Sequence, residues 1–318
     1  MPSPRYVVGV TALPESPTPM PSKLSVDRPV SDREPFTPLD WSTFAALGLI
    51  WGSSFLLIKV GLESFHPGLI TWARVALGAV ALLMLRRRPV SFDAGDRRKI
   101  VLLSVLWVGI PFTLYPLAEQ HLNSAVTGLL TGATPLFAGL FGAMWFNRPS
   151  GNPQRMGMAI GFAGVTLIAA GSGAEGGTAP LGIAMVLAAT VCYGIATNMA
   201  GPLQHKYGSV NVMRPMLAYG ALWTAPFGFA GAMRSSMALG PLLATLVLGV
   251  VGTGVAFVLM ATLVGRVGGP RASFITYLIP PIALVLGAIF LAETVAPIAL
   301  GGAALVLAAS ILASRAEK

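Results

Sequence analysis

Charged residues are scarce in this chain. Lys, Arg, Asp and Glu make up 10% of its 318 residues, whereas hydrophobic residues make up 54%. An ordinary soluble domain carries about 25% charged residues, so the composition excludes a soluble globular fold. The formal net charge is +9, but the basic residues lie in short connections between apolar runs and form no stripe with interleaved aromatic residues. That pattern argues against a nucleic-acid-binding protein.

Cysteine and buried acidic residues are also nearly absent. Cys192 is the single cysteine and lies inside an apolar run, so an intrachain disulfide and a cysteine-rich metal site are both excluded. The middle of the apolar runs holds no Asp, Glu or His, which disfavours proton coupling through a carboxylate at mid-membrane. The glycine-rich residues 249–254 lack the lysine of a phosphate-binding loop. We therefore expect neither a cofactor nor a metal.

Long apolar runs fill the chain from Trp41 onward. Runs of about 17 to 25 residues are long enough to cross a hydrocarbon core about 30 Å thick. The 37 glycines and 25 prolines would break a soluble helical fold, but membrane helices tolerate both. We predict an all-α integral membrane protein with ten transmembrane helices, at residues 41–61, 68–85, 100–118, 123–146, 156–171, 181–202, 212–232, 239–264, 272–291 and 296–313.

The third and fourth predicted helices are separated by residues 119–122 alone. A single long bent helix is the alternative there. Two helices are favoured, because one uninterrupted helix would place Glu119 and His121 in lipid, where charge is costly.

The distribution of lysine and arginine predicts the orientation in the membrane. Eighteen of these residues lie in one set of connections and tails, against Arg234 alone in the opposite set. The positive-inside rule then places both termini in the cytoplasm, which requires an even number of helices. The expected location is the inner (cytoplasmic) membrane, with a multi-pass topology.

Residues 1–40 have a different composition from the rest. They carry nine prolines and mixed charges without a long apolar run, which predicts a disordered cytoplasmic tail. They also lack the apolar core and cleavage site of a signal peptide. We expect the first membrane helix to be a retained targeting signal, and Met20 is an alternative start.

One stretch of the sequence occurs twice. The segment that begins at Asn123 aligns without a gap when it is moved by 145 positions, and the matched pairs are Thr131 with Thr276, Pro135 with Pro280, Ala138 with Ala283, Gly142 with Gly287, Ala143 with Ala288, Gly157 with Gly302 and Leu167 with Leu312. This register predicts an internal duplication, and five helices per half force the two halves into inverted orientation. We predict repeats at 41–172 and 180–313, followed by a cytoplasmic tail at 314–318. Inverted repeats around a central site are a transporter architecture.

Four motifs lie along the chain in a characteristic order and spacing. They are WGSSF at residues 51–55, PGLITWAR at 67–74, TPLF at 134–137 and IPPIALVLGAIFLAETVAPIALGGAALVLA at 279–308. Together they resemble the EamA-type carriers of the drug/metabolite transporter (DMT) superfamily, and the likeness covers nearly everything from Trp41 to Ala313. The resemblance implies a ten-helix bundle that moves amino acids, other metabolites or drugs through a cavity formed by the first four helices of each half. It also implies that helices five and ten are peripheral, often at a homodimer contact.

One position departs from the family pattern. The family usually places a glutamate at the end of the fourth and ninth helices, and Glu293 fills the second of these places. The aligned residue in the first half is Arg148. The cap or ion pair that this glutamate makes in relatives is therefore expected to be absent or reversed in one half.

Two cations lie inside predicted helices, where a charge marks a functional site by default. Lys59 stands a few residues from the end of its helix, and snorkelling to the outer interface accounts for it. Arg74 lies roughly two turns into the second helix. A cavity-facing Arg74 would bind a substrate carboxylate or pair with Glu63.

Polar and aromatic residues within the predicted helices complete the candidate substrate site. Thr131 and Thr276 stand out, because each precedes a repeated proline by one turn and a kink there would free carbonyls into a cavity. Interhelical hydrogen bonding, worth about 0.6 kcal/mol per contact, is the alternative for every residue of the set. The substrate-binding candidates are Trp51, Ser53, Ser54, Arg74, Tyr115, Thr131, Pro135, Tyr193, Asn198, Thr276, Tyr277 and Pro280, and Thr127, Thr134 and Thr253 share their character. Glu119 and His121, the titratable pair in the short outer loop, are the candidates for proton coupling.

We expect a secondary transporter that exports small organic metabolites, such as amino acids or drugs, by alternating access. An integral-membrane enzyme acting on lipid-like substrates is one alternative, but it would need paired acidic residues for Mg²⁺. Asp27, Asp32, Asp40, Asp93 and Asp96 all fall outside the predicted helices. A non-transporting membrane scaffold or channel subunit is the other alternative, against which the repeat argues.

Overall fold

The computed structural model describes residues 36–85, 90–146, 151–172 and 178–315. Every regular element in these ranges is a helix, and helices overlap all ten predicted ranges. Most of the predicted tail at 1–40, the tail residues 316–318 and Arg148 lie outside the described residues. Seven helical segments are long and apolar enough to cross a membrane, namely Pro38–Leu62, Ala94–Ala118, Ser124–Trp145, Asn152–Ser172, Ala179–Tyr207, Leu239–Val267 and Ser273–Leu291. The prediction of an all-α integral membrane protein is confirmed.

The first two spans consist of three helices. α1 (Pro38–Gly52) begins three residues before the predicted boundary, because Thr37 and Asp40 form a capping box at its start. A break at Ser53 separates α1 from α2 (Ser54–Leu62), and α3 (Pro67–Leu83) follows with a proline in its first turn. α3 and the segment Pro297–Leu312 of the last helix are apolar stretches shorter than the seven.

Two helices, rather than one bent helix, flank the short loop at 119–122. α5 (Ile110–Ala118) ends before Glu119, and α6 (Ser124–Thr131) begins after Asn123, whose side chain accepts a hydrogen bond from the Val126 backbone N–H. An asparagine at this position satisfies one of the unpaired N–H groups of a helix start. The two-helix prediction is confirmed.

The repeated prolines mark matching breaks. α6 ends at Thr131 and α7 (Thr134–Trp145) carries Pro135 in its first turn, while the 3₁₀ segment η5 (Ser273–Tyr277) gives way to α14 (Ile279–Leu291), which carries Pro280. A proline lacks an N–H, so the carbonyl four residues earlier loses its helical partner. In the first copy Thr134 Oγ1 donates to the Thr131 carbonyl at 2.8 Å and takes up this freed acceptor.

A second matched irregularity lies in the third and eighth predicted helices. The π-helical segment η2 (Ser104–Gly109) separates α4 (Ala94–Leu103) from α5, and the π-helical segment η4 (Val250–Val255) separates α11 (Leu239–Gly249) from α12 (Ala256–Val267). Their starts, at 104 and 250, differ by one residue from the repeat offset. π turns are rare and frequently occur at functional sites. The internal repeat therefore extends beyond the stretch in which the sequence reveals it.

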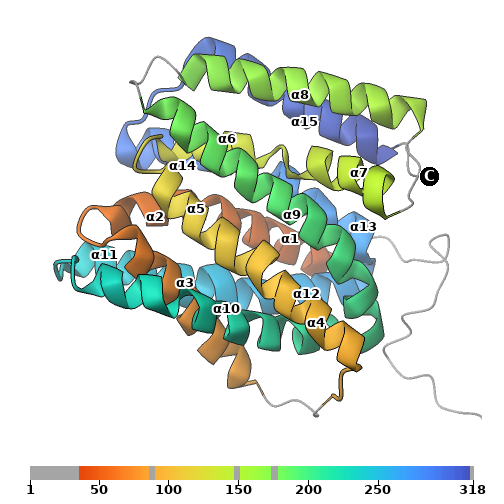
Figure 1. The fold of residues 1–318 in the computed structure, drawn as a ribbon. Helices are drawn as coiled ribbons and strands as arrows, with labels where there is room; N and C mark the ends of the chain where they lie inside the picture. The colour runs from red at the N-terminus through yellow and green to blue at the C-terminus, as the bar shows by residue number, and fades with distance from the viewer. Residues whose placement is uncertain (1–35, 86–89, 147–150, 173–177, 316–318) are drawn as a thin grey trace, which may run out of the picture. The chain divides into compact units, whose positions relative to one another are not determined.

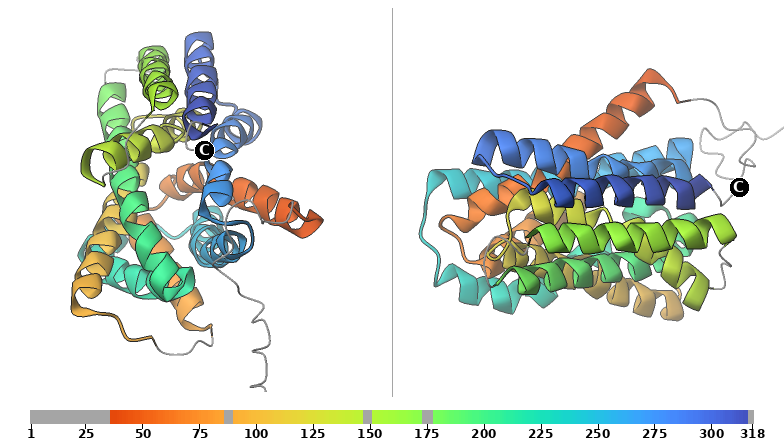
Figure 2. Two further views of the ribbon diagram at one scale, coloured as in Figure 1. Left: turned by 90° about the vertical axis from the view of Figure 1, so that its right-hand side faces the viewer. Right: turned by 90° about the horizontal axis from the view of Figure 1, so that it is seen from above.

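Several helices pack against their own counterparts in the other half. α8 (Asn152–Ser172) and α15 (Pro297–Arg315) run side by side (Figure 1 and Figure 2), and a Cβ on Gly164 would lie 2.6 Å from the Gly302 carbonyl. α3 likewise packs on α10 (Ser209–Ala232), and α6 packs on α14. α9 (Ala179–Tyr207) packs on α5 and α7, and η4 packs on α3. Elements of both halves thus surround one interior.

Candidate functional site

Arg74 occupies the interior where α3, α5 and η4 meet. The residue is 6% exposed, its Nε donates to Thr253 Oγ1 of η4 at 3.1 Å, and its guanidinium carbon lies 3.9 Å from the centre of the Phe112 ring. A guanidinium over an aromatic face is stabilised by the ring's negative face. Arg74 makes no ion pair with Glu63, which is exposed at the end of α2. Arg74 is therefore a buried cation without a carboxylate partner among the described residues.

Aromatic and hydroxyl groups lie beside this cation. Tyr115 is 3% exposed, and its ring centre lies 5.5 Å from that of Phe55 and 6.1 Å from that of Tyr193. Thr131 Oγ1 lies 3.3 Å from the Tyr115 hydroxyl, and Tyr115 and Tyr193 are both within electrostatic range of Arg74. We call Arg74, Phe112, Tyr115, Thr131 and Tyr193 the central cluster. Four of these five were predicted from the sequence as candidate site residues.

Phe112 and Phe55 were not predicted as site residues, because a phenylalanine in an apolar run has no distinguishing feature. A signal was nevertheless present in α5. Phe112, Tyr115 and Glu119 follow the i, i+3, i+7 spacing that places residues on one helix face. That face of α5 therefore carries two aromatic rings and a carboxyl group.

A proline fixes α5 against α3 next to the cluster. Pro116 cannot donate to the Phe112 carbonyl, and Thr71 Oγ1 from α3 lies 3.0 Å from that oxygen. The Thr71 hydroxyl also lies 2.9 Å from the Pro67 carbonyl, so its one proton is shared between that oxygen and the freed acceptor on α5. Because Thr71 and Arg74 are three residues apart on α3, this contact also sets the position of Arg74.

Lys59 binds the end of α5 and does not need the interface to satisfy its charge. Its Nζ donates to the backbone carbonyls of Glu119 at 2.7 Å and Leu122 at 2.8 Å. The last carbonyls of a helix lack intrahelical partners and carry partial negative charge, so a lysine there is stabilising. The structure thus gives Lys59 a capping role at the end of α5, and its snorkelling to the outer interface stays a prediction.

Replacement of Lys59 by methionine is expected to lower thermal stability. Methionine keeps much of the side-chain volume but leaves two carbonyls without their donor, at a cost of about 1 to 3 kcal/mol. The matched control is Lys99→Met, which breaks the surface pair between Lys99 and Asp96, a kind of pair worth about 0 to 1 kcal/mol. Melting temperatures in detergent measure both effects, and equal melting temperatures for the two variants would contradict the capping role.

Glu119 is buried, although the sequence places it in a loop. The residue is 1% exposed, and neither carboxyl oxygen has a hydrogen-bond partner among the described residues. Burial raises the pKa of the Glu119 carboxyl well above its ordinary value, and the positive charge of Lys59 opposes this shift only in part. His121, the other predicted coupling residue, is half-buried. The two candidates therefore occupy different environments.

Glu293 caps a helix of the other half. Its carboxylate accepts hydrogen bonds from the Ser124 N–H at 2.8 Å, the Ser124 hydroxyl at 2.9 Å and the Ala125 N–H at 2.9 Å. The first turn of α6 supplies unpaired donors and partial positive charge, and both favour a carboxylate. The second copy aligns Pro270 with Ala125, and proline has no N–H to donate. The same cap therefore cannot form in full in the second half, which agrees with Arg148 at the position aligned with Glu293.

The remaining predicted residues bond mainly to nearby backbone. Asn198 donates to the carbonyls of Ala138 and Gly194 and ties α9 to α7, and Tyr277 donates to the Ser310 carbonyl. Ser53, Ser54 and Thr276 bond to carbonyls within their own turns, and Trp51 packs against Phe257 with ring centres 6.5 Å apart. Pro135 and Pro280 form the helix breaks described above. These contacts are packing interactions, and their part in substrate binding stays a prediction.

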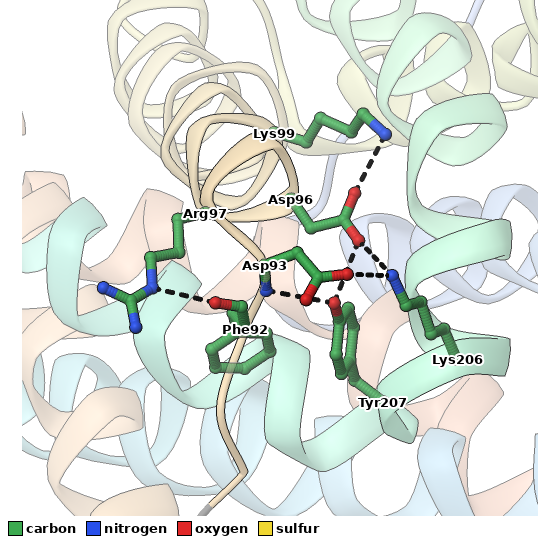
Figure 3. Close-up of polar contacts among 7 residues, drawn as sticks. All are labelled: Phe92, Asp93, Asp96, Arg97, Lys99, Lys206 and Tyr207. Carbon is green, nitrogen blue, oxygen red and sulfur yellow. Dashed lines mark hydrogen bonds and ion pairs between the residues drawn. The ribbon is translucent and has the colours of Figure 1, made fainter.

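A polar cluster ties α4 to α9 at the ends of these helices opposite Glu119. Lys206 Nζ lies 2.6 Å from Asp93 Oδ2 and 2.8 Å from Asp96 Oδ2, and the Tyr207 hydroxyl donates to Asp96 at 2.9 Å (Figure 3). The hydrogen bond from Lys206 lowers the pKa of Asp93. Arg266, at the end of α12, similarly pairs with Asp40 at the start of α1. Residues distant in sequence thus join at this end of the helices.

A surface groove of about 370 Å³ lies away from the central cluster. Its lining comes from η2, α5 and α10 and includes Gly109, Thr113, Trp223 and Phe227. No charged side chain lines it. Specific polar groups set the orientation of a bound solute, and this groove offers no charged group for that purpose.

The helical fold and the buried charged interior define a multi-pass membrane transporter. The chain belongs to the EamA-like transporter family, whose model matches residues 41–170 and 180–315. A protein of Streptantibioticus cattleyicolor, named as a probable terminal-alkyne amino-acid exporter, is 28% identical and covers 83% of this chain and 90% of its own length. The uncharacterized inner membrane transporter YedA of Escherichia coli strain K12 is 24% identical over 82% of this chain and 85% of its own.

A solved crystal structure shares the fold. It superposes with a TM-score of 0.55 and 18% sequence identity, over 87% of this chain and 97% of the other. The family match and the named relatives show that this chain transports small molecules.

Proposed function

We propose that this transporter exports small organic solutes that carry a carboxylate, with amino acids as the main class. Arg74 is the observation that carries the proposal. A buried cation is costly in a membrane, and this one bonds only through Nε to Thr253 within the described part of the chain. A carboxylate would take the remaining guanidinium donors in the bidentate geometry that arginine favours. The name of the S. cattleyicolor relative supports the amino-acid class.

We further propose ten membrane helices in two inverted repeats, at 41–172 and 180–313. Three observations support this topology: the matched proline breaks, the matched π segments, and the packing of α3, α6 and α8 on their counterparts. We place both termini on the cytoplasmic side of an inner membrane, so the loop at 119–122 faces outward. The cluster of Asp93, Asp96 and Lys206 then faces the cytoplasm. Assembly as a homodimer stays a prediction.

The central cluster then lies between two sets of ties. Glu293 and Lys59 join elements at the outer end, and the Lys206 and Arg266 ion pairs join elements at the inner end. Alternating access requires that only one set opens at a time around the site. We propose that the five residues of the central cluster bind the solute between these ties.

Exchange in proteoliposomes tests this function. Vesicles containing the purified protein and loaded with an unlabelled amino-acid mixture are expected to take up external labelled amino acid, whereas protein-free vesicles are not. Labelled uncharged sugars serve as the solute control, because Arg74 gives them no charge to bind. Lack of exchange for every carboxylate-bearing solute in a broad panel would refute the proposal.

A further inference from the structure

A small groove opens where the end of α3 meets the first half of α10, on the side that the proposed topology places toward the cytoplasm. Its volume is about 250 Å³, and the segment before α4 completes its lining. Leu83, Phe92, Pro215 and Ala218 give the groove apolar walls, and Arg214 gives it a charge. Apolar walls with one charged group fit a ligand that is itself part apolar and part charged.

Arg214 has no carboxylate partner among the described residues. One of its guanidinium nitrogens, Nη2, donates to the Leu83 carbonyl at the end of α3, at 3.1 Å. A guanidinium carries five N–H donors, so this single bond leaves most of them for a ligand. Arg214 also follows the first turn of α10, whose partial positive charge attracts anions as well. The charged part of the ligand is therefore expected to be an anion.

A second arginine lies next to the groove. Arg97 Nε donates to the Phe92 carbonyl at 3.1 Å, and the Arg97 guanidinium points away from Asp93 (Figure 3). Asp93 and Asp96, the acids nearest to Arg97 in sequence, both pair with Lys206. They therefore leave the charge of Arg97 uncompensated. The groove has one arginine in its lining and another bound to a lining residue.

An exposed apolar stripe on α10 continues from the groove. Ala218 and Leu222 follow Arg214 at intervals of four residues, and Phe229 follows Leu222 by seven, spacings that put all four on one helix face. Leu222 is 66% exposed and Phe229 is 61% exposed, and the Phe229 ring packs on Trp72 of α3 with ring centres 5.0 Å apart. A hydrocarbon chain can lie along this stripe while its charged head stays at Arg214.

We propose that this groove binds one anionic phospholipid of the cytoplasmic leaflet, with its phosphate on Arg214 and Arg97 and an acyl chain along the α10 stripe. Basic pockets between membrane helices on the cytoplasmic side bind anionic head groups. A zwitterionic lipid fits less well, because its ammonium group is repelled by the two arginines. The bound lipid contacts α3 and α10, which belong to different repeats of the proposed topology, and so links them at the inner side. The site is independent of the solute that the protein transports.

Lipid binding to the purified full-length protein in detergent tests the proposal. Native mass spectrometry measures the affinity for phosphatidylglycerol and for phosphatidylcholine with the same acyl chains, and wild type is expected to prefer phosphatidylglycerol. Arg214→Gln is expected to lower the phosphatidylglycerol affinity about fivefold, the contribution of one arginine at an anionic lipid surface. Arg98→Gln changes an exposed arginine outside the groove lining. It is the matched control and is expected to bind both lipids as wild type does.

Ala218→Phe is a second variant that keeps every charge. Its ring is expected to fill the groove and lower the phosphatidylglycerol affinity, and it decides the question if Arg214→Gln fails to fold. Thermal unfolding gives another readout, because a lipid that binds the folded protein stabilises it. Phosphatidylglycerol is expected to raise the melting temperature of wild type and Arg98→Gln more than phosphatidylcholine does, and to lose this advantage in Ala218→Phe.

Three results would overturn the lipid site. One is equal affinity of wild type for the two lipids, and another is an unchanged phosphatidylglycerol affinity in either folded groove variant. The third is displacement of phosphatidylglycerol by inorganic phosphate, which would show that the arginines bind a free anion and that the apolar stripe contributes nothing.

Discussion

Replacement of Arg74 by glutamine is expected to abolish transport of anionic and zwitterionic solutes while the protein still reaches the membrane. Glutamine retains hydrogen-bonding groups but has no charge for a carboxylate. Loss of one partner of a buried charge pair costs about 2 to 5 kcal/mol, and each 1.4 kcal/mol corresponds to tenfold in affinity. The affinity for carboxylate solutes should therefore fall by at least about 30-fold. Labelled exchange in proteoliposomes measures the loss.

Two comparisons separate this effect from misfolding. Arg74→Ala should abolish transport as Arg74→Gln does, because both remove the charge. Arg234→Gln changes an exposed arginine after α10 and should transport as wild type. Equal expression and a single gel-filtration peak confirm folding of each variant. Unchanged transport by Arg74→Gln would remove Arg74 from the substrate site.

Replacement of Glu293 by alanine is expected to give a large loss of stability. The substitution removes the acceptor of three hydrogen bonds at the start of α6. Loss of a helix N-cap costs about 0.5 to 2 kcal/mol, and the carboxylate here also carries a charge that the helix start favours. A cost of about 2 kcal/mol lowers the melting temperature by about 3 °C in a chain of this size.

Glu293→Gln is the graded control for this prediction. The amide retains one acceptor oxygen but no charge, so its melting temperature should fall between those of wild type and Glu293→Ala. Thermal unfolding in detergent, monitored as loss of the monodisperse gel-filtration peak, gives the order of the three melting temperatures. If Glu293→Ala is as stable as wild type, the cap contributes nothing to stability.

The positions of the helices were predictable from sequence because they depend on local features. Apolar length locates a membrane helix, and a proline such as Pro135 interrupts the backbone hydrogen bonds wherever it stands. The matched breaks at Pro135 and Pro280 therefore followed from the repeat alone. The π segments did not, because one inserted residue in a helical turn leaves no pattern in the order of side chains.

The burial of individual side chains, and the contacts they make in the interior, were less predictable. Glu119 lies in a short loop, and only the packing of neighbouring elements makes it one of the buried residues. Lys59 meets the end of α5 across about 60 residues of sequence, a distance over which no local pattern operates. Arg74 was predicted as a cation within a membrane helix, but its contact with Thr253 depends on how the two halves meet.

Two long-range contacts at the starts of α1 and α6 have a consequence for the order of synthesis. Asp40, at the start of α1, pairs with Arg266 from a position 226 residues later, and Ser124 receives its acceptor from Glu293, 169 residues later. A nascent chain that has emerged only as far as the first repeat holds both helix starts without these partners. The first half must therefore wait in the membrane, incompletely bonded, until the second half is inserted beside it.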